Sequence, residues 1–141
     1  MFYGDNRNDI RQVYFDAWQA ANNKQPLDAL QQQIVEVIQF HPEYQPFLSR
    51  SDNLDKDFNP EQGQTNPFLH MGMHMAIKEQ LSINQPTGIR DIYQKLLLKH
   101  TDAHQVEHQM MDCIAEMIWQ AQSKQQTPDM EAYVRQLRGL V

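Results

Sequence analysis

Four of the six histidines in this sequence form two pairs with the same spacing. His70 and His74 are four residues apart, and so are His104 and His108. On an α-helix of about 3.6 residues per turn, side chains four residues apart lie on one face, one turn from each other. Two imidazoles placed in this way can bind the same metal ion. The two pairs therefore predict a metal site built from two helices.

The hydrophobic pattern around the first pair places it toward the interior of the protein. His70 and His74 share a helix face with Ile77 and Leu81. A further histidine, His100, ends an apolar stripe in the segment between the two pairs. Polar side chains are costly to bury unless each one has a partner. These three histidines are therefore expected to have partners inside the protein.

The second pair brackets an acidic residue. Glu107 lies near the middle of an apolar arc of the expected helix, and His104 and His108 lie on the flank of that arc. The apolar members of the arc are Met110, Met111, Ile114, Ala115, Met117 and Ile118. A carboxylate among such residues would help to neutralise a bound cation.

A divalent metal ion satisfies all of these inward polar groups at once. We expect Glu107 to be a further ligand or to accept a hydrogen bond from a ligand. Imidazole ligands favour zinc, with iron, manganese, nickel or copper as alternatives. The expected metal ligands are His70, His74, His104, His108 and His100.

Two questions about this site stay open at the level of the sequence. A metal with an open coordination position would be catalytic, with Glu107 as the general base for a bound water, whereas a closed site would be structural. In the alternative without a metal, the chain is an interaction or structural protein. Its histidines and Glu107 would then form a buried hydrogen-bond network.

The rest of the pattern predicts an all-α protein, a compact bundle of five to six helices with no sheet. Apolar residues recur at helical spacing, and no stretch alternates long enough to indicate a strand. We expect one domain over residues 1–141, with an irregular loop at 43–65 that could cover the site. The expected helices span about 6–22, 26–40, 67–83, 88–100, 102–122 and 128–138.

Local signals place the helix ends and the remaining reactive residues. Asn66 is expected to cap the helix that carries the first histidine pair, and Thr101 or Asp102 the helix that carries the second, with Asp102 and Gln105 at the spacing of a capping box. His41 precedes a proline and is interpreted as a helix-end residue near the negative end of the helix dipole. Met71 and Cys113 are expected on faces turned away from the apolar stripes.

Composition excludes several classes of function. The net charge of −6 and the absence of a basic cluster argue against nucleic-acid binding. The sequence shows no secretory signal and no apolar run long enough to span a membrane, and its single cysteine fits a reducing compartment. We therefore expect a cytoplasmic protein. Trp119, at the edge of its apolar arc, and Met75 could form a contact in a homodimer or with another protein, and a partly covered edge of the core would explain them equally well.

Several stretches resemble one bacterial family, called domain of unknown function 1841. They include Asn66–His70 with His74–Ile77, then Gly88–Arg90, and His104 with Glu107–His108. The likeness continues through Trp119–Gln122 and the last helix, and so covers nearly the whole chain. The resemblance implies a small stand-alone cytoplasmic protein and identifies the histidine segments as family motifs. It implies no particular activity.

Overall fold

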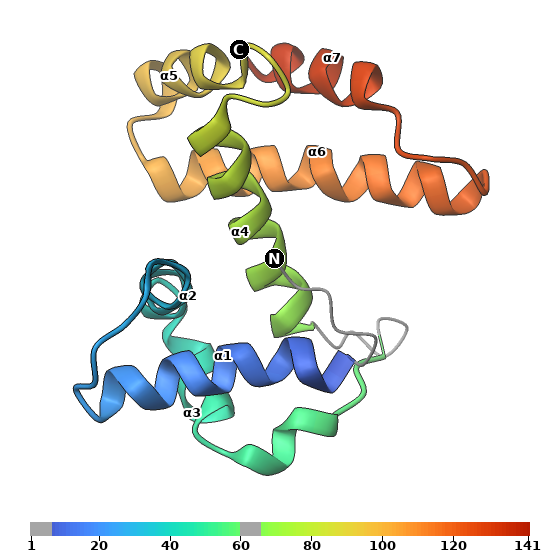
Figure 1. Ribbon diagram of the computed structural model, residues 1–141. Coiled ribbons are helices and arrows are strands. Elements are labelled where there is room, and N and C mark those ends of the chain that lie inside the picture. The colour runs from blue at the N-terminus through green and yellow to red at the C-terminus, as the bar shows by residue number, and fades with distance from the viewer. Residues whose placement is uncertain (1–6, 60–65) are drawn as a thin grey trace. The chain divides into compact units, whose positions relative to one another are not determined.

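Every element of secondary structure that residues 7–59 and 66–141 form is helical (Figure 1). These are the residues that the computed structural model describes. They form seven α-helices and two short 3₁₀ turns and contain no strand, which confirms the all-α prediction. The α-helices are α1 (Arg7–Asn22), α2 (Ala29–Gln39), α3 (Gln45–Leu48), α4 (Pro67–Ile83), α5 (Ile89–His100), α6 (Ala103–Ser123) and α7 (Met130–Leu140).

The predicted count of five to six helices is too low, because the segment expected to be an irregular loop contains α3. Two 3₁₀ turns flank this helix, at Pro42–Tyr44 and Ser51–Asp55. Pro42 and Pro46 each lie in the first turn of such an element, where a fixed φ favours the helical conformation and the missing N–H costs nothing. Proline therefore starts short helices here as well as ending long ones. Residues 60–65 of the expected loop lie outside the described residues.

The chain divides into two compact units, Met1–Met71 and Gly72–Val141, and the boundary falls inside α4. The single-domain organisation over residues 1–141 stays a prediction. In the first unit, α1 packs on α2 (Figure 1). Tyr14 and Ala17 of α1 are buried, as are Ile34 and Ile38 of α2.

Arg11 of α1 binds the segment that follows α3 through hydrogen bonds. Its guanidinium donates hydrogen bonds to the backbone oxygens of Leu54 at 2.9 Å and Lys56 at 2.8 Å. The same group lies 4.5 Å from the ring centroid of Phe68. A cation over an aromatic ring is attracted by the negative face of the ring. With 6 % of Arg11 exposed, its bonds to carbonyl groups replace the water that the charge has lost.

In the second unit, α5, α6 and α7 contact one another (Figure 1). The turn before α5 requires glycine, because Gly88 has φ +93°, a conformation that side chains disfavour. The core also includes Ile77 from α4, with Leu96 of α5, Met110 of α6 and Leu137 of α7. The Tyr133 hydroxyl donates to the Gln80 side chain at 2.7 Å and so links α7 to α4.

Two residues lie deeper than the sequence predicts. Cys113 is 7 % exposed and belongs to the core of the second unit, and Met71 is fully buried. The prediction assumed that each helix has a single apolar face. Helix α6 has core contacts beyond the predicted arc, so a residue outside that arc is also buried. Of the two residues expected at a contact surface or at a partly covered edge of the core, Met75 is 8 % exposed and Trp119 is 60 % exposed.

Candidate metal centre

His74 is the most deeply buried histidine of the second unit, with 1 % of its surface exposed. It belongs to α4, which starts as predicted. The Asn66 side chain accepts hydrogen bonds from the backbone N–H groups of Phe68 and Leu69, and Pro67 occupies the first turn. The helix then carries His74 to a position facing α6. There, His74 Nδ1 lies 2.7 Å from Glu107 Oε1.

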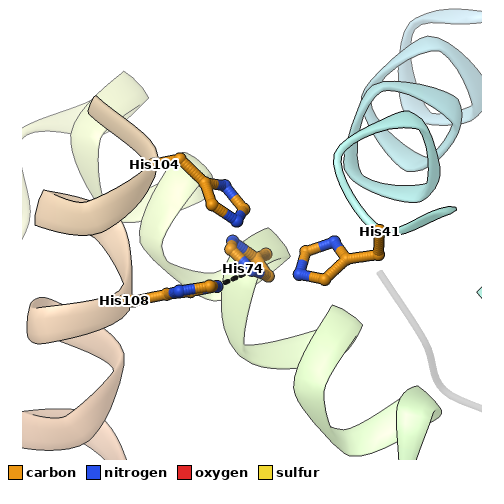
Figure 2. A group of neighbouring side chains, drawn as sticks. All are labelled: His41, His74, His104 and His108. Carbon is orange, nitrogen blue, oxygen red and sulfur yellow. Dashed lines mark hydrogen bonds between the residues drawn. The ribbon is translucent and has the colours of Figure 1, made fainter. Parts of the chain in front are cut away.

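Helix α6 supplies the other two imidazoles. Of the two expected cap residues, Asp102 caps it, because its side chain accepts from the backbone N–H groups of His104 and Gln105. His104 and His108 are one turn apart, with ring centroids separated by 4.1 Å. Figure 2 shows both rings directed toward His74. One ring nitrogen of each of the three histidines lies within 4.8 Å of the other two.

His74 Nε2 lies 3.0 Å from His108 Nε2 (Figure 2). A carboxylate only accepts, so Glu107 fixes the proton of neutral His74 on Nδ1 and leaves the lone pair on Nε2. Two imidazole lone pairs repel each other at this distance unless a proton or a cation lies between them. The geometry therefore fits either a hydrogen bond from His108 or a shared metal ion.

The electrostatics keep Glu107 ionised. Burial by itself would raise the pKa of the Glu107 carboxyl. The hydrogen bond from His74 and the charge of Lys78, with Nζ 3.6 Å from Oε2, outweigh burial, so the pKa lies below its ordinary value. The predicted inward position of Glu107 is confirmed, since 7 % of the residue is exposed. Its negative charge faces the histidine that would bind the cation.

The nitrogen atoms of His74 and His108 have the spacing of two ligands of one metal ion. Zinc–nitrogen bonds of about 2.0–2.1 Å place two ligand nitrogens roughly 2.9 to 3.3 Å apart, for angles between a right angle and the tetrahedral one. The His74–His108 distance of 3.0 Å lies within that range. A carboxylate that holds the other ring nitrogen of a ligand is also the usual arrangement around metal-bound histidine. His74 and His108 therefore fit a divalent ion, and a ring nitrogen of His104 lies within 4.8 Å of theirs.

Two further histidines predicted as ligands have other surroundings. His70 belongs to the first unit, where its Nε2 lies 3.1 Å from Nε2 of His41. His100, at the end of α5, lines a hollow together with Gln109 and Cys113 of α6 and Leu140 of α7. The structure thus brings together His74, His104 and His108 in the second unit and joins His70 to a histidine of the first.

His41 is the histidine whose surroundings the sequence interpretation missed. Its position at the end of α2 is as predicted, since its Nδ1 lies 2.8 Å from the Val37 carbonyl oxygen of that helix. The pairing with His70 has no counterpart in a spacing of four residues. One signal was present, because His41 continues the apolar stripe of Ile34 and Ile38 by another three residues. The residue is 4 % exposed.

The fold and the site together define an α-helical protein with a histidine–glutamate cluster between two of its helices. The family follows from a comparison of sequences. The chain belongs to the family described as Domain of unknown function (DUF1841), whose model matches residues 6–139, which confirms the resemblance. Neither the curated proteins nor the solved structures include a match. None of the described helices is both long and apolar enough to cross a membrane.

Proposed function

We propose that this protein binds a divalent metal ion, with zinc favoured, through His74, His104 and His108. The observation that carries the proposal is the pair of contacts that the two ring nitrogens of His74 make. Its Nδ1 faces the ionised Glu107 carboxylate, while its Nε2 lies 3.0 Å from the corresponding nitrogen of His108. The three imidazoles come from two helices of one unit, and a common ion would join those helices. Iron, manganese, nickel and copper are the alternatives that this donor set accepts.

The contacts of Glu107 support a role in positioning His74. One carboxylate oxygen accepts from the ring of His74, and the other lies near Lys78. In enzymes, zinc bound by three protein ligands holds a water as its fourth ligand and lowers the pKa of that water. Glu107 as the general base in such a reaction stays a prediction. Its contacts support instead a residue that orients a ligand and increases its basicity.

Metal uptake by untagged protein tests the proposal. Separate samples of the purified chain would be loaded with zinc, iron, manganese, nickel or copper, dialysed, and measured by elemental mass spectrometry, and zinc binding would also be measured by calorimetric titration. We expect His108→Gln and His104→Gln to lower the zinc affinity strongly, because each removes one of the three imidazoles. His100→Gln is the matched control and should leave this affinity unchanged, since His100 lines a different hollow. A wild-type chain that takes up none of the five metals contradicts the proposal.

A buried hydrogen-bond network is the second candidate, because 2.7 Å and 3.0 Å are also ordinary hydrogen-bond distances. Thermal unfolding separates the two. A metal that binds only the folded chain stabilises it by about 2.7 kcal/mol when its free concentration is 100 times Kd. The melting temperature should then fall on addition of a chelator and recover with zinc. A melting temperature that neither treatment changes supports the network.

A further inference from the structure

A second pair of histidines, in the first unit, repeats the features of the proposed centre. His41 and His70 approach through their Nε2 atoms at 3.1 Å, as His74 and His108 do at 3.0 Å. The two rings of this pair are nearly perpendicular, with an interplanar angle of 77°. His41 comes from the end of α2 and His70 from the first turns of α4. Two separate elements therefore direct imidazole nitrogens at each other.

The proton of His41 is fixed by its surroundings. The Val37 carbonyl oxygen can only accept, so Nδ1 of His41 carries the hydrogen in the 2.8 Å contact. In the neutral ring, the lone pair is then on Nε2, the atom that faces His70. A histidine that binds metal through one nitrogen commonly donates from the other to a carboxylate or a backbone carbonyl. His41 has this arrangement, with Val37 in the place that Glu107 takes for His74.

Packing holds the His41 ring in this orientation. Tyr44 stacks on it with a centroid distance of 4.9 Å and an interplanar angle of 6°. The Tyr44 ring lies edge-on to the His70 ring, with 6.1 Å between the ring centroids. Burial, with the charge of Glu43, raises the pKa of Tyr44 to about 12, so the phenol is neutral at physiological pH. A helix-end role for His41 explains its bond to Val37 but not the close approach of a second imidazole.

We propose that His41 and His70 bind a second divalent metal ion, so that one chain takes up two. With two imidazoles instead of three, the second site should bind more weakly than the first, and solvent would complete its coordination. Imidazole ligands suit copper, nickel and zinc, and Cu²⁺ should bind tightest because it stands highest in the general order of divalent affinities. The Nε2–Nε2 distance fits two ligands at about a right angle around an ion with nitrogen bonds of roughly 2.0–2.1 Å.

The test is a calorimetric titration of untagged, metal-free protein with Zn²⁺, repeated with Cu²⁺. We expect two equivalents in the wild-type chain, a tight one and a weaker one. His70→Gln should lose the weaker equivalent and keep the tight one, whereas His108→Gln should weaken the tight one and keep the other. His100→Gln, the matched control, should keep both. The opposite responses of the two variants distinguish failure of this proposal from failure of the first.

Three outcomes overturn the second site. One is a wild-type chain that binds a single equivalent, since the contact between His41 and His70 would then be a hydrogen bond only. Another is a His70→Gln variant that still binds two. The third is one equivalent lost in both His70→Gln and His108→Gln. His70 is only half-buried, and circular dichroism would confirm that its variant folds. If that variant does not fold, the wild-type stoichiometry decides between one ion and two.

Discussion

Glu107 has a different partner on each of its carboxylate oxygens, and these two contacts predict that it orients His74. Oε1 accepts from His74, and Oε2 faces Lys78. Glu107→Gln keeps the shape but removes the charge. Loss of a carboxylate that orients a metal-bound histidine typically lowers metal affinity by about 10- to 100-fold. We expect a decrease of this size for zinc, measured by competition with a chelator, with the stoichiometry unchanged.

Glu79→Gln is the control for this charge, because Glu79 is an exposed residue of the same helix as His74. An equal loss of affinity in both variants would mean that the effect is general electrostatics and that the contact with His74 is not essential. Complete loss of binding in Glu107→Gln would instead indicate that Glu107 is itself a metal ligand. That result would reopen the prediction of a direct role for its carboxylate.

Single residues also show where sequence reasoning reaches its limit. The inward positions of His74 and Glu107 follow from helical periodicity, which is a local property. The pairing of His41 with His70 joins residues on two elements, and no spacing along the chain encodes it. The burial of Cys113 depends on how many neighbours surround α6, which periodicity on one helix does not reveal. The main apolar face that carries His74 and Glu107 was therefore predictable, but further buried positions such as Cys113, and the partners of each face, were not.

At the scale of elements, α6 is fixed at the end that carries the site. The Asp102 side chain accepts from the backbone N–H groups of His104 at 3.0 Å and Gln105 at 3.4 Å. Replacing such a cap by alanine costs about 1 kcal/mol, because those N–H groups lose their acceptor. Asp102→Ala should lower the free energy of unfolding by this amount in a urea titration. It should also weaken zinc binding, because His104 is in the first turn that frays.

Asp102→Asn is the matched variant, since asparagine caps helices about as well as aspartate. It should retain most of the stability and the affinity. If Asp102→Asn loses as much as Asp102→Ala, the negative charge near the helix N-terminus matters more than the cap itself. Capping signals are among the features that the sequence predicts well, because Asn66 and Asp102 act on backbone groups only two or three residues away. The start of α2 was predicted less well, since the helix begins after its cap Asp28 and not at about residue 26.

At the scale of the whole molecule, the proposed tight site belongs to one of two units, and Cys113 reports on that unit. The thiol is buried in the core of α5, α6 and α7, and burial raises its pKa, so it reacts slowly while this core is closed. In moderate denaturant, unfolding of the whole unit becomes the main route to its exposure. That unfolding separates the ligands on α4 from those on α6. Metal binding should therefore slow the reaction of Cys113 with a thiol reagent, although Cys113 is not a metal ligand.

The expected protection can be calculated from the mass-action relation. When free zinc is 100 times Kd, the unfolded fraction, and with it the rate of Cys113 labelling by a thiol reagent, should fall by about 100-fold. His108→Gln should lose this protection at the same zinc concentration. If zinc instead slowed labelling by binding the thiol itself, the protection would persist in that variant. Equal labelling of the wild-type chain with and without zinc would contradict the prediction. The measurement thus connects the imidazoles on α4 and α6 to the stability of the unit that contains them.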